Sequence, residues 1–155
     1  MSGTDPAQTV RDIIGANRYL VLATADRAGR PWGSPVYFAH LGYVEFFWVS
    51  SPDVTHSRNI AVRPEVGIVI FDSGAAIGTG QGVYMDAIAE QLHGDGATRG
   101  IEAFSRRSLA HGGVAWTGAD VGEGGDLRLY RATGKAHWLL AKDGRPDHRV
   151  PVHLT

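Results

Sequence analysis

A cluster of polar side chains stands between an aromatic and an apolar stretch of the chain. Its members are Ser50, Ser51, His56, Ser57 and Arg58. Hydroxyl, imidazole and guanidinium groups bind phosphates, and a short helix beginning at Pro52 and Asp53 offers unpaired backbone N–H groups for the same purpose. The cluster is therefore typical of an anion-binding site. It also fits a helix cap followed by a solvated helix face, and the sequence leaves both interpretations open.

A second candidate is the glycine-rich segment Ser73 to Gly82, which reads SGAAIGTGQG. It lacks the Gly-Lys-Ser/Thr of a Walker A loop, and it joins two predicted strands rather than a strand and a helix. Phosphate binding of either common type is therefore excluded. A flap over a bound ring and a plain surface loop remain as alternatives.

Histidine spacing predicts no metal site. The seven histidines are His40, His56, His93, His111, His137, His148 and His153. They include no i,i+4 pair and no tight group, although a haem needs only one axial histidine. The chain also lacks cysteine, a G-x-S-x-G motif and a convincing carboxylate pair. These absences favour chemistry carried by a bound cofactor, and no catalytic acid or base is assigned, although Tyr37 is a candidate proton donor.

The elements that must position these residues are mostly strands. Helices are predicted over 5–16, 54–62 and 98–110, and Thr4 or Asp5 caps the first. Strands are predicted over 19–25, 32–40, 43–50, 66–71 and 83–92, followed by a hairpin of 127–132 and 135–141 around Gly134 and a short strand at 150–154. Short turns between consecutive strands indicate an antiparallel sheet that closes into a barrel.

Two of these strands lack polar alternation. Residues 66–71 read VGIVIF and residues 46–49 read FFWV. An antiparallel strand with one wet face alternates, so continuous apolar character means that both faces are covered. One face fills the barrel, and the other needs a helix or a second subunit. We therefore expect a homodimer.

Composition limits the classes of partner. The 155 residues fit one domain spanning 1–155, and the net charge of −1 gives no general attraction to nucleic acid or to an acidic membrane. The first 20 residues lack the pattern of a signal peptide, and no apolar run reaches the ~20 residues that span a bilayer. A cytoplasmic protein is expected.

The segment from Tyr19 to Glu90 resembles the pyridoxamine 5′-phosphate oxidase-like, FMN-binding split-barrel family. The resemblance rests on the opening LATADRAGRP, an aromatic strand ending in serines, the helix with HSRNI and a following proline, and the apolar strand after it. The closing LRLYRATGKAHWLL fits more loosely. The family implies a six-stranded Greek-key split β-barrel with flanking helices. It also implies a homodimer that binds FMN, or in some branches a deazaflavin or haem, at the subunit interface.

The resemblance also implies which residues bind the cofactor. They are Ser34, Pro35, Val36, Tyr37, Val49, Ser50, Ser51, Thr55, His56, Arg58 and Gln81. The second strand would run along the ring and phosphate tail, and Gln81 lies near a glutamine that reaches the partner's flavin.

The chain departs from the oxidases that give the family its name. Those enzymes have an arginine where this chain has Ser34, and a basic pair where it has Thr55 and His56. The resemblance therefore implies an FMN- or deazaflavin-dependent oxidoreductase acting on a small organic substrate, other than a pyridoxamine phosphate oxidase. The alternative is a non-catalytic protein that binds a flavin, haem or another planar ligand on the same barrel.

Overall fold

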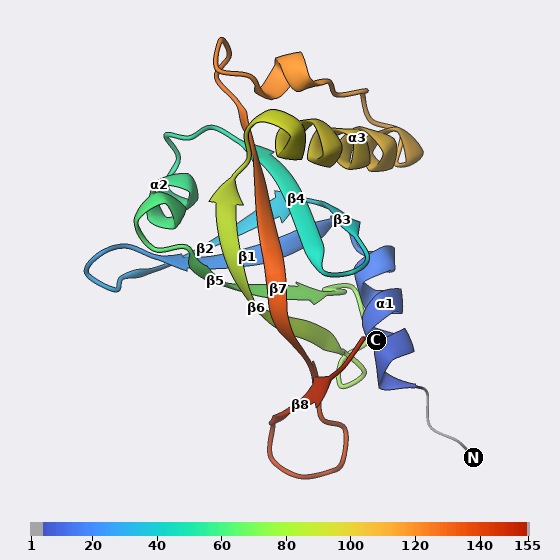
Figure 1. The fold of residues 1–155 in the computed structure, drawn as a ribbon. Helices are drawn as coiled ribbons and strands as arrows, with labels where there is room; N and C mark the ends of the chain where they lie inside the picture. The colour runs from blue at the N-terminus through green and yellow to red at the C-terminus, as the bar shows by residue number, and fades with distance from the viewer. Residues whose placement is uncertain (1–4, 155) are drawn as a thin grey trace.

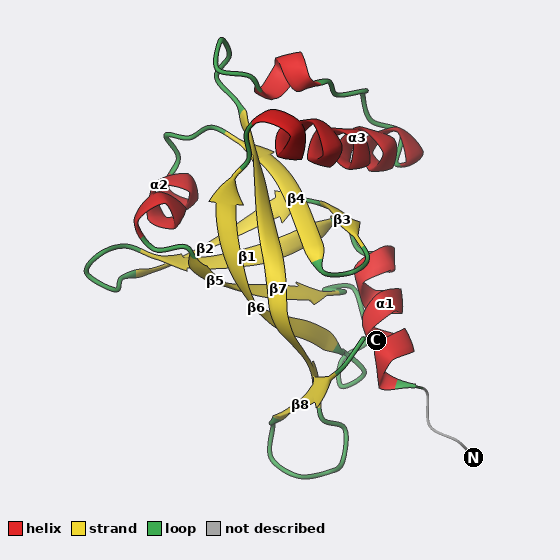
Figure 2. Cartoon of the chain, in the orientation of Figure 1, coloured by secondary structure: helices red, strands yellow, loops and turns green. Residues whose placement is uncertain are grey.

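The computed structural model describes residues 5–154, which form a curled antiparallel sheet with three α-helices around it (Figures 1 and 2). The strands are β1 (Tyr19–Ala25), β2 (Pro31–Tyr37), β3 (Ala39–Leu41), β4 (Glu45–Ser50), β5 (Glu65–Phe71), β6 (Gly82–Gln91), β7 (Arg128–Leu140) and β8 (Arg149–Val152). The helices are α1 (Pro6–Ala16), α2 (Thr55–Val62) and α3 (Gly94–Ala110), with a short 3₁₀ helix η1 (Gly118–Val121).

The two ends of the sheet are joined by one stretch of chain. The strand order is β2-β1-β5-β6-β7-β4-β3, and β8 pairs with β7. Tyr37 at the end of β2 pairs with Tyr19 of β1, and Ala39 at the start of β3 pairs with Phe47 of β4. The chain therefore leaves one edge of the sheet at Phe38 and immediately pairs with the other edge.

This crossing explains why the sheet has eight strands where six were expected. The predicted single strand over 32–40 is divided at Phe38, whose amide donates a hydrogen bond to the carbonyl of Arg18 at 3.1 Å. The short strand predicted at the C-terminal end is β8. Together these two additions account for the difference.

The predicted hairpin around Gly134 is wrong. Strand β7 runs without a turn through this position, and residues on both sides of Gly134 pair with β6. Gly134 opposes Ala87 while Ala136 opposes Asp86, which leaves Lys135 as the extra residue of a bulge. A Cβ at Gly134 would lie 3.1 Å from the His137 ring, so the glycine permits a close approach rather than a turn.

Helices α1 and α3 follow the prediction with small changes at their ends. Asp5 caps α1 by accepting a hydrogen bond from the amide of Ala7 at 3.2 Å, while the alternative cap Thr4 lies outside the described residues. Helix α3 begins at Gly94 instead of Thr98. The two glycines in its first turn hide this start, because glycine is a poor helix former.

The apolar side chains form two clusters, one on each face of β4. Phe46 and Trp48 point into the sheet's interior, and Phe47 packs beneath α3 with Phe104 and Leu129; the three β4 side chains are fully buried. The prediction that both faces of this strand are covered is confirmed. In β5 the alternate residues are buried, but Phe71 on the other face is 47% exposed.

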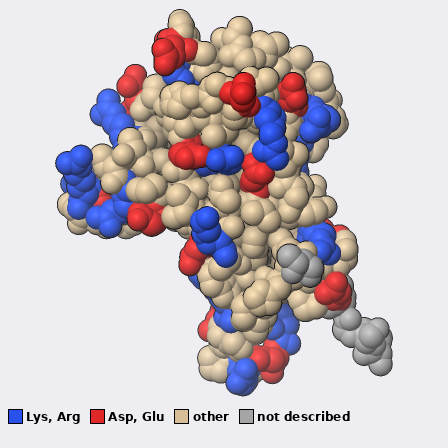
Figure 3. All heavy atoms as spheres, viewed as in Figure 1, with Lys and Arg blue, Asp and Glu red and all other residues tan. Residues whose placement is uncertain are grey.

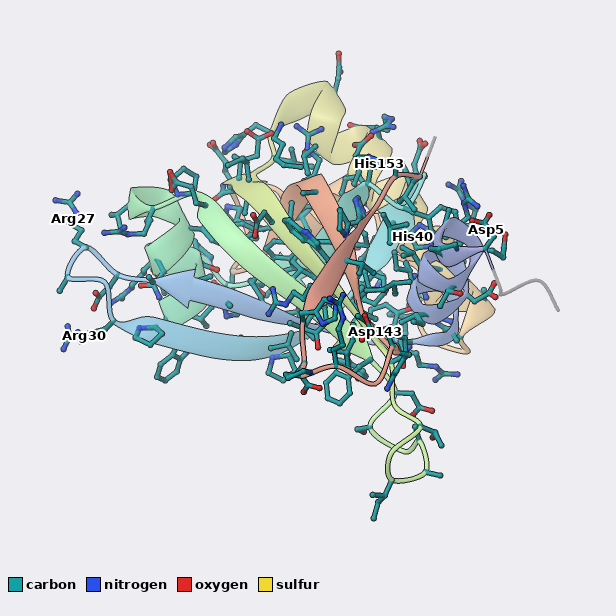
Figure 4. All side chains as sticks on the ribbon, turned by 90° about the horizontal axis from the view of Figure 1, so that it is seen from below. Asp5, Arg27, Arg30, His40, Asp143 and His153 are labelled. Carbon is teal, nitrogen blue, oxygen red and sulfur yellow. The ribbon has the colours of Figure 1, made fainter. Side chains whose placement is uncertain are left out.

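The face of the molecule shown in Figure 3 carries charges of both signs. Lys, Arg, Asp and Glu side chains of both signs are interspersed over the face in Figure 3. Figure 4 shows Arg27 and Arg30 at the tip of the turn between β1 and β2, pointing away from the body. Within residues 5–154, no helix combines the length and apolar character that crossing a membrane requires.

Candidate functional site

A groove of about 610 Å³ lies between β2, β4, the start of α2, and α3 with the loop after it. Its lining residues are Arg18, Tyr19, Pro35, Val36, Tyr37, Val49, Ser50, His56, Phe104, Ser108, His111, Gly113, Val114, Trp116 and Leu127. The walls are mainly apolar and aromatic, with polar groups gathered at the two ends. This composition is typical of a site for a small organic ligand or cofactor.

At the α3 end, a tyrosine and a histidine are hydrogen-bonded. The Tyr37 hydroxyl lies 2.7 Å from Nδ1 of His111. The Tyr37 ring also makes edge contacts with Tyr19 and Phe104, at centroid distances of 6.0 and 5.5 Å. These contacts fix the ring, so the hydroxyl has a defined position at the groove.

Burial sets the protonation of this pair. It raises the pKa of Tyr37, and it lowers the pKa of His111, an effect that the positive charges of Arg107 and Arg18 reinforce. At neutral pH the phenol is therefore protonated and the imidazole is neutral. In the tautomer that carries its proton on Nε2, Nδ1 of His111 accepts the hydrogen bond of the Tyr37 hydroxyl.

Arg107 holds the helix that carries His111. Its Nη2 donates to the backbone carbonyl of Asn17 at 2.8 Å and lies 3.4 Å from those of Ile14 and Gly15, and its guanidinium stacks over the Phe38 ring at 4.6 Å. A cation at the C-terminal end of α1 is favoured by the helix dipole. Arg107 thereby ties α3 to α1.

The loop after α3 forms the outer wall. Ser108 Oγ donates to the carbonyl of Val114 at 2.7 Å, and the amide of Trp116 donates to Ser105 Oγ at 2.8 Å. A Cβ at Gly113 would lie 2.6 Å from Ser108 Oγ, so only glycine permits this close turn. The loop presents Trp116 to Phe104, with ring centroids 5.6 Å apart.

At the α2 end, Ser50 Oγ lies 3.0 Å from Nε2 of His56. Burial lowers the pKa of His56, so this ring is also neutral at neutral pH. The helix N-cap is Val54, whose side chain accepts no hydrogen bond. The first amides of α2 therefore lack a side-chain cap, and this end of the groove is electropositive without a fixed cation.

The structure brings six of the eleven predicted cofactor-binding residues together at the groove. They are Pro35, Val36, Tyr37, Val49, Ser50 and His56. Ser51 is the next residue along and accepts a hydrogen bond from the amide of Asp53 at 3.1 Å. Arg58 is exposed on α2 and does not line the groove.

Three further predicted residues lie elsewhere. Ser34 is 8% exposed and pairs with Leu22 on the inner face of the sheet, away from the groove. Thr55 faces a separate hollow on the opposite side of the start of α2, beside Trp32 and Asn59. Gln81 bonds to the backbone of its own chain.

The side chain of Gln81 anchors the glycine-rich loop to β7. Its Oε1 accepts from the amides of Gly82 at 2.8 Å and Leu140 at 2.9 Å, and its Nε2 donates to the carbonyl of Leu140 at 2.9 Å. The loop projects from the body with Ile77 fully exposed. Figure 4 shows this segment extending beyond the rest of the protein.

The sequence did not identify nine of the residues that line the groove, most of which belong to α3 and the loop after it. The missed residues are Arg18, Tyr19, Phe104, Ser108, His111, Gly113, Val114, Trp116 and Leu127. The helix amphipathicity and the two glycines after it predicted α3 and its end, but His111 is 74 positions from Tyr37. No local spacing links residues so far apart.

The donor set of the groove suits a flat ring with a phosphorylated side chain. Aromatic and aliphatic walls cover a ring, and the uncapped α2 N-terminus with Ser50 and His56 suits an anion. Among residues 5–154, no three or more His, Asp or Glu side chains are grouped to hold a metal ion.

Known proteins share this architecture. The family model for pyridoxamine 5′-phosphate oxidase matches residues 7–137. A heme binding protein from Mycobacterium smegmatis superposes with a TM-score of 0.72 and 21% identity over 97% of this chain; the chain spans 60% of that protein's length. A search of curated proteins finds no match.

Two shorter proteins are similar over most of their length. HutZ, the heme storage protein from Vibrio cholerae, has a TM-score of 0.67 and 22% identity over 85% of this chain and 92% of its own. A FAD-binding protein from Mesorhizobium loti has a TM-score of 0.63 and 18% identity, covering 86% and 90%. At these identities the likeness establishes a shared fold.

Proposed function

Because the chain belongs to the pyridoxamine 5′-phosphate oxidase family, we propose that the groove binds a flavin, FMN or a deazaflavin, and that the protein is a flavin-dependent oxidoreductase acting on a small organic substrate. The main support for this proposal is the shape and lining of the groove. An aromatic groove of about 610 Å³ ends at the uncapped N-terminus of α2, beside the Ser50–His56 pair.

The residues at each end of the groove would hold different parts of the cofactor. Ser50, His56 and the first amides of α2 would bind the phosphate, and Val49 and Val36 would contact the ring or its side chain. A neutral imidazole and backbone dipoles bind phosphate more weakly than the basic pair of the pyridoxamine phosphate oxidases. We therefore propose a different substrate from that of those enzymes.

When bound, a flavin supplies hydride transfer, and the protein supplies position, hydrogen bonds and exclusion of water. Phe104, Val114 and Trp116 would cover the groove from the α3 side. Ser108 and Ser105 would keep this wall in place through their bonds to the loop.

We also propose that a second copy of the chain covers the outer face of β1, β2, β5 and β6. Pro35, Val21, Val69 and Tyr84 lie opposite one another in a row across these four strands. Pro35 and the neighbouring Tyr19, which is 60% exposed, also line the groove. A partner on this face would complete the groove, as expected for a cofactor at a subunit interface.

For the sheet, we infer the six-stranded Greek-key barrel of the family, with β2 and β3 counted as one bent strand and β8 as an addition. The support is the chain crossing at Phe38, which links the two edges of the sheet.

FMN titration tests the cofactor proposal. The purified protein should quench FMN fluorescence with micromolar or tighter affinity. Ser50→Ala and His56→Ala should each weaken binding by about tenfold to a hundredfold, because hydrogen bonds to charged groups contribute about 1.5–3 kcal/mol. His93→Ala, at the N-terminus of α3 and outside the groove, is the matched control. Absence of binding for both FMN and a deazaflavin would contradict the proposal.

A haem-binding protein is the second candidate, because two neutral imidazoles line the groove. Burial lowers the pKa of both His56 and His111, which suits axial ligation of iron. The similar folds of two haem proteins agree with this alternative. Hemin should then give a Soret band that shifts in His111→Ala or His56→Ala but not in His93→Ala.

A further inference from the structure

One wall of the groove carries hydrogen-bond donors, and no carboxylate accompanies them. Tyr37 and His111 form the donor pair, and neither Asp nor Glu is among the groove-lining residues of the described chain. A positively charged substrate would have no partner here. A neutral molecule with an acceptor oxygen would have a hydrogen-bond donor, Nε2–H of His111, and apolar surroundings.

The Tyr37–His111 pair can donate a proton from the imidazole of His111. When the Tyr37 hydroxyl donates to Nδ1 of His111, the imidazole proton is on Nε2. Within residues 5–154, Nε2 of His111 makes no hydrogen bond to another residue. The charged and titratable groups facing the pair are Arg107, Arg18 and Tyr19, of which the two arginines favour negative charge nearby.

We propose that His111, positioned by Tyr37, binds the carbonyl oxygen of an apolar conjugated substrate, an α,β-unsaturated carbonyl compound, through Nε2–H and gives that oxygen its proton during reduction. This inference rests on the proposed flavin site. It adds the class of substrate, the catalytic residue His111 that would touch it, and Tyr37 as the residue that positions His111. The apolar neighbours Phe104, Val114 and Leu127 suit the hydrocarbon part of such a molecule.

The step balances in atoms and electrons. The β-carbon receives a hydride from the reduced flavin, the C=C pair moves toward the carbonyl, and the oxygen gains a pair of electrons. His111 Nε2–H gives that oxygen a proton, and the Tyr37 hydroxyl passes its own proton to Nδ1. The product is an enol, which returns to the saturated carbonyl compound in water, and water reprotonates Tyr37.

A cofactor-independent experiment tests the donor pair. The probe is p-nitrophenol, whose phenolate mimics the anionic oxygen and absorbs visible light. The apoprotein should bind the phenolate in preference to the phenol and so lower the apparent pKa of the dye. Tyr37→Phe and His111→Asn should each weaken phenolate binding by about tenfold, since hydrogen bonds to a charged oxygen contribute on that order.

The matched controls remove a tyrosine hydroxyl and an imidazole at positions outside the groove. Tyr43→Phe changes a tyrosine at the turn before β4, and His93→Asn changes a histidine at the start of α3; both lie outside the groove. These variants should bind p-nitrophenolate as the unmodified protein does. Equal affinity in the unmodified protein, Tyr37→Phe and His111→Asn would overturn the proposal, as would no binding of the dye at all.

Nitrogen-15 NMR of the imidazole checks the arrangement directly. His111 should show the Nε2–H tautomer, and Tyr37→Phe should reduce that preference. Reduction of 2-cyclohexen-1-one by protein saturated with FMN should fall at least tenfold in both variants. If FMN fails to bind but the dye results hold, the flavin proposal fails and the donor pair stands. If FMN binds and the dye results fail, the donor pair alone is overturned.

Discussion

The outer faces of β4 and β5 are covered to very different extents. Phe47 on the outer face of β4 is fully buried beneath α3, whereas Phe71 on the outer face of β5 is 47% exposed. Both strands are continuously apolar in sequence. The chain covers the outer face of β4 with its own helix and leaves that of β5 partly exposed, so continuous apolar character alone does not show what covers a strand.

The same contrast defines the two sides of the groove. Helix α3 and its loop supply Phe104, His111 and Trp116, while Tyr19 and Pro35 belong to the uncovered face. The groove is therefore fully walled on the α3 side and open on the β1–β2 side. This is the arrangement expected if a second copy completes the site.

The largest effect is expected where the helix covers the sheet. Phe47→Ala should lower the free energy of unfolding by about 3–5 kcal/mol, because it leaves a cavity in a fully buried position. Phe71→Ala should lower it by less than about 1 kcal/mol, because the side chain is half exposed in the single chain. Urea unfolding at a concentration that keeps the protein monomeric measures both. If the two variants lost similar amounts of unfolding free energy, the difference in coverage between the two faces would be contradicted.

Two glycines of α3 differ in how closely the rest of the protein packs against them. A Cβ at Gly100 would lie 2.8 Å from Leu129 Cδ2 and 2.9 Å from Phe47 Cδ1, so Gly100→Ala should cost about 1–3 kcal/mol through overpacking. At Gly96 the nearest atom would be Leu92 Cδ2 at 3.8 Å. Gly96→Ala should therefore be neutral or stabilise by up to about 1 kcal/mol through helix propensity. Thermal unfolding compares the two, and equal destabilisation would argue against close packing of α3 at Gly100.

The burial of His40 makes the stability of the protein depend on pH. Burial and the charge of Arg107 lower the pKa of His40 to about 4. In the unfolded chain His40 titrates near its ordinary value of 6.5, so between pH 6.5 and about 4 the unfolded state binds more protons. Stability from this group is present above pH 6.5 and is lost as the pH falls toward 4. His40→Gln should flatten this part of the pH–stability curve, and His153→Gln serves as the comparison; an unchanged curve would contradict the assignment.

The smallest effect on folding is expected on the uncovered face. Val69→Asp should change the free energy of unfolding of the single chain by less than about 1 kcal/mol, because Val69 is only partly buried there. It should abolish the proposed dimer, since an unpaired carboxylate is costly at a protein interface. Light scattering after size-exclusion chromatography measures the mass. Glu102→Arg on the exposed side of α3 is the control and should leave the mass unchanged.

Local patterns in the sequence predicted much of the fold. Strand β1 has the predicted bounds because an apolar run ends at a turn in which Gly29 has a positive φ of 84°. Gly134 carried the same signal for a turn but serves a bulge, because its neighbours still pair with β6. The sequence alone does not distinguish a glycine that is needed for a positive φ from a glycine that is needed because a side chain would not fit.

Within the site, sequence separation decided what could be predicted. Ser50 and His56 are six positions apart, and the expected polar cluster brings them to 3.0 Å. Tyr37 and His111 come together only through the packing of α3 on β3 and β4. The position of that helix depends on Phe47, Gly100 and Arg107, whose roles are visible only in the folded chain.

The absorbance spectrum of the freshly purified protein tests the central claim, that the groove holds a flavin, most directly. The account predicts the visible bands of a flavin or deazaflavin, which persist after gel filtration or return when FMN is added to protein purified without it. They should weaken in Ser50→Ala and His56→Ala and persist in His93→Ala. A Soret band in their place, or a spectrum that added FMN leaves unchanged, would contradict it.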